Sequence, residues 1–175
     1  MEMSKRGLRE IRFYESAEPR VYPDSSAKLT IGIGHLLTKE ELRTGILKIG
    51  KKTYNWKTCS LSNEEMDELL GIDLDKIEGP LSSMFLWDGT FGTVLKQYQF
   101  DALICLIFNI GMGAFKSSTL LRRLEQKDID GAMEAWTWWN KETKRGVKVV
   151  SNGLVTRRGR EIKLFTTGVY SAEGG

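Results

Sequence analysis

The chain has 175 residues, which is enough for one domain with a sizeable buried core. Hydrophobic residues make up 41% and charged residues 28%, the composition of an ordinary soluble globular protein. The formal net charge of +3 and the pI near 8.8 are compatible with nucleic acid, an anionic cell wall or a membrane surface. Because no basic stripe or recognition helix accompanies the charge, a nucleic-acid-binding module has only the net charge in its favour.

The amino terminus, MEMSKRGLREIRFYES, is charged from its second residue and has no hydrophobic stretch, which predicts neither a secretory signal nor a membrane anchor. The most apolar segment, residues 102–110, is far shorter than the ~20 residues that span a bilayer, so we expect a buried helix there. Cys59 and Cys105 show no metal-ligand spacing, and Cys105 is expected to be a reduced core residue. Activity outside a cytoplasm would therefore require another export route.

The first predicted element is a short amphipathic helix over residues 4–14, with Ser4 as its cap. Its apolar residues recur at a spacing of three: Leu8, Ile11 and Tyr14. Glu15 would follow at the carboxyl end, where the negative pole of the helix dipole disfavours an ionised carboxylate.

Residues 28–34 alternate in the manner of a strand, and the segment PDSS before them predicts a turn after a short strand RVY. Leu29, Ile31 and Ile33 share the apolar face of this strand. We expect its other face, with Thr30 and two glycines, to be bare enough for a ligand to approach the backbone.

Capping-box patterns begin two further helices, at Thr38 with Glu41 and at Ser62 with Glu65. The second helix is long and is expected to end or bend at Gly79–Pro80. From residue 84 onward the patterns predict helices only, over 97–109, 117–126, 130–140 and 155–165.

These elements predict an α+β, mainly α fold in a single domain spanning residues 1–175. A small β-containing lobe covers about 14–61, a connecting helix about 62–80, and a helical lobe about 81–175 together with the amino-terminal helix 4–14. Two lobes of unequal character joined by one helix predict a cleft that suits a substrate.

Two carboxylates that flank a cleft are the usual equipment for cutting a glycosidic bond. Glu15, at a helix end before an apolar β unit, suits the acid, and Asp24, in a polar turn, suits the ionised partner. Thr30 would hold a water. Each residue also has an ordinary structural explanation, as a surface charge, a turn residue or strand filler, so spacing and context must decide.

The spacing resembles that of the phage-type lysozymes, the muramidases of glycoside hydrolase family 24. Their signature has a Glu, eight intervening residues, an Asp or Cys, five intervening residues and a Thr, which Glu15, Asp24 and Thr30 match without a gap. Thr30 also opens TIGIGHLLT, which is very close to the family's own strand. QFDALICLIFNIGMGAFKSSTLLRRL and WNKETKRGVKVVSNGLVTRRGREIKLF resemble the family's central helix and closing segment, whereas residues 43–60 match least.

The resemblance implies a lysozyme-like fold in which Glu15 is the general acid, and Asp24 and Thr30 place the attacking water. Inversion of configuration is the outcome in the best-studied relatives, and the separation of the carboxylates decides it. The resemblance further implies that Arg157 reaches Glu15, where a cation would oppose the effect of the helix end.

His35, the sole histidine, invites a general-base interpretation, but the resemblance implies a structural ion pair with Asp73 instead. Positions that line the family's saccharide cleft correspond to Leu36, Phe108 and Ser118, although Phe108 also suits a core position. For the tryptophans at 136, 138 and 139, core filling is favoured over sugar stacking.

The resulting hypothesis is a monomeric endolysin-type muramidase that cleaves the β-1,4 bond between N-acetylmuramic acid and N-acetylglucosamine without a metal or cofactor. It would accumulate in a bacterial host cytoplasm and act on peptidoglycan glycan strands in the periplasm or cell wall. It would reach the wall through a holin-type pore, with no physical contact implied, or as part of a delivered machine. The alternatives are the same enzyme deployed as an antibacterial effector or tail-associated lysozyme, or a non-catalytic fold that only binds wall glycan.

Overall fold

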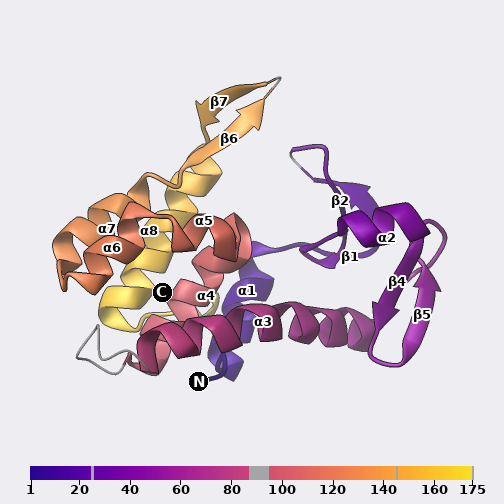
Figure 1. Ribbon diagram of the computed structural model, residues 1–175, viewed down its shortest axis with the longest axis horizontal. Coiled ribbons are helices and arrows are strands. Elements are labelled where there is room, and N and C mark those ends of the chain that lie inside the picture. Colours follow the sequence, from indigo (N-terminus) through magenta and orange to yellow (C-terminus); the bar gives the residue numbers. More distant parts are fainter. Residues whose placement is uncertain (25, 87–94, 145, 175) are drawn as a thin grey trace. The chain divides into compact units, whose positions relative to one another are not determined.

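The computed structural model describes residues 1–24, 26–86, 95–144 and 146–174. The fold is α+β and mainly α, as the sequence predicts. The chain forms two compact units, one of residues 12–75 and one of residues 1–11 together with 76–175 (Figure 1). Within the described ranges, none of the helices combines the length and the apolar character that a membrane crossing requires.

The unit of residues 12–75 contains two small antiparallel sheets. In the first, β1 (Ala17–Pro23) pairs with β2 (Leu29–Ile33), which pairs with β3 (His35–Leu36). After α2 (Lys39–Thr44), β4 (Ile46–Ile49) and β5 (Lys52–Asn55) form a hairpin in the segment that least matches the family. The first turns of α3 (Asn63–Leu86) complete the unit.

Both predicted capping boxes are present. Thr38 Oγ1 accepts from the Glu41 amide at 3.2 Å and Glu41 Oε2 accepts from the Thr38 amide at 2.7 Å. Ser62 and Glu65 exchange the same two bonds at 3.2 and 3.0 Å. Each box satisfies two amides that the first turn of a helix leaves without an intrahelical partner.

The long helix does not end at Gly79–Pro80, because α3 continues through Pro80 to Leu86. The alternative expectation of a bend there stays a prediction. Proline removes one amide from the helical ladder, which weakens a helix interior. Leu81, directly after it, is fully buried, and this burial favours the continued helix over a chain that turns away.

The expectation of a bare face on β2 is also wrong. Thr30 and Gly32 are as buried as Ile31 and Ile33, which lie on the opposite side of the strand. Gly32 has a φ of +67°, and a Cβ built on it would lie 3.4 Å from Leu69 Cδ2 of α3. Gly32 therefore allows α3 to pack closely against β2, and the small residue serves the core rather than an open surface.

The second unit is helical and is built around a buried helix. Among the described residues, its helices are α1 (Lys5–Tyr14, of which residues up to Ile11 belong here), the part of α3 from Lys76 onward, α4 (Gln97–Ile110), α5 (Met112–Lys116), α6 (Thr119–Glu125), α7 (Ile129–Thr137), α8 (Asn152–Thr167) and the 3₁₀ turn η1 (Ser171–Glu173). All residues of α4 from Phe100 to Ile107 are buried, and α8 packs along it while α6 packs on α7. Ser4 caps α1 as expected, since its Oγ accepts from the Gly7 amide at 3.0 Å.

Among the described residues, the all-helical expectation after residue 84 is wrong for the segment that follows α7. β6 (Lys141–Lys144) and β7 (Val147–Val150) form an antiparallel hairpin that extends away from α5–α8 (Figure 1). Alternating valines in VKVV and the positive φ of Gly146, +81°, suit a hairpin better than a helix. The preceding helix accordingly ends at Thr137 rather than at residue 140.

Two further expectations concern the tryptophan and cysteine side chains. Trp136 is fully buried and donates its indole N–H to Glu161 Oε2 at 3.0 Å, as expected for core filling. Trp138 is 56% exposed, so core filling is wrong for this residue, which follows the last turn of α7. Cys59 and Cys105 are both free thiols, and Cys105 is buried as predicted.

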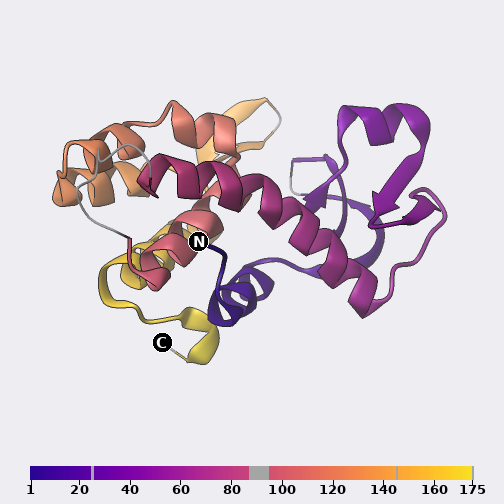
Figure 2. The same cartoon turned by 60° about the horizontal axis from the view of Figure 1, so that its bottom comes forward.

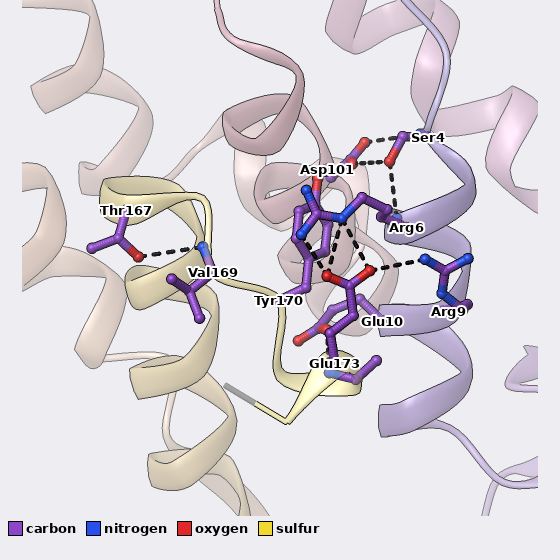
Figure 3. Close-up of polar contacts among 11 residues, drawn as sticks. Ser4, Arg6, Arg9, Glu10, Asp101, Thr167, Val169, Tyr170 and Glu173 are labelled. Carbon is purple, nitrogen blue, oxygen red and sulfur yellow. Dashed lines mark hydrogen bonds and ion pairs between the residues drawn. The ribbon is translucent and has the colours of Figure 1, made fainter.

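The carboxyl-terminal segment is attached to α1 (Figures 2 and 3). Tyr170 donates its hydroxyl to the buried Asp101 Oδ2 at 2.6 Å, and the Ala172 amide donates to Glu10 Oε2 at 2.8 Å. Glu173 forms ion pairs with Arg6 at 2.5 Å and Arg9 at 2.8 Å. The two ends of the chain are thus joined through one set of polar contacts.

Candidate active site

Glu15 lies immediately after the last residue of α1, at the position predicted for the acid. Its side chain is half-buried, and β1 begins two residues later. The helix end is itself held in the unit, because Arg12 in the last turn forms an ion pair with Asp67 of α3. Glu15 is therefore presented by the junction between a helix and a strand, where the local backbone is determined on both sides.

Asp24 occupies the turn between β1 and β2, and its carboxylate is fixed by the backbone of that turn. Oδ1 accepts from the Ser26 and Lys28 amides, both at 2.8 Å, and the Asp24 amide donates to the Lys28 carbonyl at 2.8 Å. Within the described part of the chain, the hydrogen bonds of the carboxylate all go to Oδ1. Because the turn engages Oδ1, Oδ2 can contact water or a substrate. The two bonds to Oδ1 fix the orientation of the whole carboxylate.

Thr30 lies in the middle of the same small sheet. It is opposite Tyr22 of β1 and Leu36 of β3, and only 4% of the residue is exposed. Its Oγ1 donates to the carbonyl of Lys28 at 3.3 Å, and the amide of the same Lys28 donates to Asp24. Thr30 and Asp24 are accordingly linked through Lys28, and a movement of one would disturb the other.

Tyr22 is a member of this group that the sequence analysis missed. Burial raises the pKa of the Tyr22 phenol above its ordinary value, and the negative charges of Glu15, Glu18 and Asp24 raise it further. Both carboxylates of the proposed pair therefore lie within electrostatic range of one neutral phenol. The sequence feature that could have identified Tyr22 is its position two residues before Asp24, because residues two apart in a strand share a face.

His35 forms the pair with Asp73 that the resemblance implies. Its Nδ1 lies 2.6 Å from Asp73 Oδ2, and its Nε2 lies 3.2 Å from Glu41 Oε2, the oxygen that also caps α2. Burial lowers the pKa of His35, but the hydrogen bonds and charges of Asp73 and Glu41 outweigh burial and leave the pKa raised. With both ring nitrogens engaged and 4% of the residue exposed, this geometry suits a structural link better than proton transfer.

The positions expected to line the saccharide cleft differ in their surroundings. Leu36 is 47% exposed in β3. Phe108 is half-buried near the end of α4, where the fully buried run of that helix has already ended. Ser118 is buried, and its Oγ accepts from the Leu121 amide at 3.0 Å as the cap of α6, so its hydroxyl has a clear structural task.

Arg157 belongs to a buried polar cluster of the helical unit. Its Nε donates to Glu161 Oε1 at 3.0 Å and its Nη2 donates to the Cys105 carbonyl at 3.2 Å, while Arg158 Nη2 donates to the same Glu161 oxygen at 2.9 Å. Burial raises the pKa of Glu161, and the guanidinium groups of Arg158 and Arg157 oppose this effect. The approach of Arg157 to Glu15 stays a prediction.

The described residues thus bring Glu15, Tyr22, Asp24 and Thr30 into one unit, in and around one three-stranded sheet. His35, Asp73 and Leu36 belong to the same unit, whereas Phe108, Ser118 and Arg157 belong to the helical one. Nowhere in the described ranges do three or more His, Cys, Asp or Glu side chains gather in a way that could hold a metal ion.

Comparisons with known proteins converge on one family. The family model for phage lysozyme matches residues 12–161. The endolysin of Salmonella phage P22 is 34% identical over 165 residues, which cover 94% of this chain and 98% of the relative. The SAR-endolysin of Enterobacteria phage P21 is 42% identical over 146 residues, 82% of this chain and 73% of that protein. Among solved structures, an endolysin from Escherichia coli O157:H7 phage FAHEc1 is similar with a TM-score of 0.75 and 31% identity, covering 97% and 96% of the two chains.

Proposed function

Because the chain belongs to the phage lysozyme family, we propose that it cleaves the β-1,4 bond between N-acetylmuramic acid and N-acetylglucosamine. The protein is a peptidoglycan-hydrolysing glycosidase, and the specific bond that it cleaves is the subject of the proposal. One observation supports the proposal for this bond: Glu15, Asp24 and Thr30 are grouped around Tyr22 in a single compact unit. A pair of carboxylates in different surroundings is what glycoside hydrolysis requires.

In the proposed mechanism, Glu15 in its protonated form gives a proton to the glycosidic oxygen as the bond to the anomeric carbon breaks. Two backbone amides hold the Asp24 carboxylate through Oδ1, and its Oδ2 orients the attacking water and accepts the proton that this water loses as it bonds to the anomeric carbon. The Thr30 hydroxyl helps to position this water. The Tyr22 phenol stays neutral among the carboxylates, where it adds no further negative charge.

The test is the loss of a single proton-donating group. Glu15→Gln keeps the size of the side chain and removes the acid, so lysis of permeabilised bacteria should slow by about 10²- to 10⁴-fold. Turbidity gives the rate, and mass spectrometry of the released fragments identifies the cleaved bond by the sugar at the new reducing end.

Glu18→Gln is the matched control, because Glu18 lies three residues away in β1, also interacts with Tyr22, and is exposed. We expect this variant to retain most of the activity. Equal lysis by the wild type and Glu15→Gln would defeat the catalytic assignment and favour a fold that only binds wall glycan. N-acetylglucosamine at the new reducing end would contradict the bond specificity alone.

We further propose that the enzyme acts as a monomer without a cofactor, on the peptidoglycan of the periplasm or cell wall. The SAR-endolysin among its relatives supports the location of the substrate, and passage through a holin-type pore remains one route to it. Deployment as an antibacterial effector or a tail-associated lysozyme would use the same chemistry, and the neighbouring genes would distinguish these roles.

A further inference from the structure

In the sequence, the segment that contains β6 and β7 accounts for the net charge of the whole chain. Of the 26 basic and 23 acidic residues, four basic residues and one acidic residue lie between positions 141 and 150. The other 165 positions therefore hold 22 basic and 22 acidic residues and are neutral overall. A charge excess confined to ten residues creates a local field that a uniformly distributed charge would not create.

The strand register places two of these charges on one exposed face, which we call the lysine face. Lys141 is opposite Val150 and Thr143 is opposite Lys148, so these four side chains point to the same side of the hairpin. All four are exposed. The two rungs are about 7 Å apart along the strands, so the lysines stand on neighbouring strands at diagonal corners.

The opposite face has a different character. Glu142 and Val149 are half-buried there, and Glu142 forms an ion pair with Lys144 at 2.9 Å. Hydrogen bonding to Lys144 lowers the pKa of Glu142 and keeps that carboxylate ionised. By contrast, no carboxylate among the described residues pairs with Lys141 or Lys148.

The base of the hairpin is held in place. The Ser151 amide donates to the Asn140 carbonyl at 2.9 Å, directly beyond the last rung. Arg158 of α8 donates through Nη1 to the Trp139 carbonyl at 3.3 Å. The lysine face is therefore a preformed surface on the helical unit rather than a free tail, which lowers the entropic cost of binding.

We propose that the lysine face binds the anionic glycan strands of peptidoglycan, as a site additional to the catalytic residues. This proposal rests on the proposed function for its choice of polymer. Lys141 and Lys148 would pair with the free carboxylates of the stem peptides attached to muramic acid, and the Thr143 hydroxyl between them would bind polar sugar groups.

The exposed valines argue against a lipid membrane as the partner. Val150 lies on the lysine face, whereas Val147 is opposite Lys144 and lies on the other face. The hairpin thus has no single apolar side to insert into a bilayer, and interfacial binding needs one. An extended, charged and hydrated polymer matches the surface better.

The test compares two double variants with the same total charge. Lys141→Gln with Lys148→Gln removes the lysine face, and Lys116→Gln with Lys163→Gln removes two exposed lysines from α5 and α8 of the same unit. Binding to purified peptidoglycan sacculi is measured by co-sedimentation at low and high salt, in the Glu15→Gln background so that the polymer stays intact.

The hairpin variant should bind about fivefold more weakly at low salt and lose most of the salt dependence, while the control should bind as the parent does. Equal binding by the two double variants would overturn the proposal, even if the wild type hydrolyses peptidoglycan. Hairpin-dependent binding to vesicles with anionic lipid in preference to sacculi would overturn it in favour of a membrane. If the wild type does not hydrolyse peptidoglycan, only the catalytic proposal fails, because co-sedimentation does not depend on turnover.

Discussion

The Asp24 carboxylate has one observed task in the turn and one proposed task in catalysis, and the two tasks use different properties of the group. Oδ1 holds the β1–β2 turn by accepting two amides, which any oxygen acceptor at that position could do. The proposed orientation of water requires a negative charge on Oδ2 as well. The tasks are therefore separable by substitution.

Asp24→Asn should keep the fold and lose activity, because an amide oxygen still accepts the Ser26 and Lys28 amides but carries no charge. We expect a loss of lytic rate of about 10²-fold or more, with little change in the free energy of unfolding. Asp24→Ala should in addition destabilise the protein by about 1–2 kcal/mol, because the two amides lose their acceptor. Lysis rates and urea unfolding of both variants give the comparison, and full activity in Asp24→Asn would remove Asp24 from the mechanism.

At the scale of elements, His35 joins three of them. It belongs to β3, pairs with Asp73 of α3, and contacts the Glu41 carboxylate that caps α2. One imidazole ring thus links a strand to two helices inside the unit of residues 12–75. Glu41 connects the cap and the ion pair, because a single oxygen accepts from the Thr38 amide and faces His35.

The stability contributed by this link should depend on pH in a defined direction. The pKa of His35 is raised above 6.5 in the folded protein, so folding favours the protonated ring. The contribution is then fully present below pH 6.5 and is lost as the pH rises through the higher folded-state pKa. His35→Asn should lower the free energy of unfolding by about 3 kcal/mol at pH 5.5 and by less at high pH.

Unfolding of wild type and His35→Asn by urea at a series of pH values measures the difference directly. Lysis assays on the same samples, corrected for the folded fraction, test the other part of the assignment. A large loss of turnover in fully folded His35→Asn would contradict a purely structural role.

At the scale of the whole molecule, the last residues of the chain are part of its fold. Asp101 of α4 is fully buried and accepts from Ser4 through both carboxylate oxygens, from Gln97 and from Tyr170. Burial raises the pKa of the Tyr170 phenol, and so does its hydrogen bond to Asp101. A central helix, the first helix and the carboxyl terminus therefore share one charged acceptor (Figure 3).

Tyr170→Phe should destabilise the protein by about 2 kcal/mol, because a buried carboxylate loses one of its donors while the ring can still pack. Tyr98→Phe is the matched control, since none of the bonds found for the described residues involves the Tyr98 hydroxyl and its ring lies beside Gly168. Thermal unfolding of both variants gives the difference. Equal melting temperatures would show that the terminal contact contributes little to the stability of the fold.

Features that depend on neighbours in sequence were predictable. The Ser4 cap, both capping boxes and the position of Glu15 after α1 follow from residues within one helical turn of each other. The match of Glu15, Asp24 and Thr30 to a family spacing likewise needs no tertiary contact. Tyr22 lies in the strand before Asp24, so its position was predictable in principle. Its role was not, because the charges of Glu15 and Asp24 act on its phenol only after the chain has folded.

By itself, the sequence determined the family, the mainly helical class and the chain positions of the proposed catalytic residues. Only the tertiary structure decided which surfaces are covered: α3 packs over Gly32 of β2, and Tyr170 reaches Asp101 across 69 positions. It also decided that residues 141–144 and 147–150 pair as two strands rather than continuing a helix. The physical reason is that caps and periodicity are local, whereas burial and strand pairing depend on which distant residues come into contact.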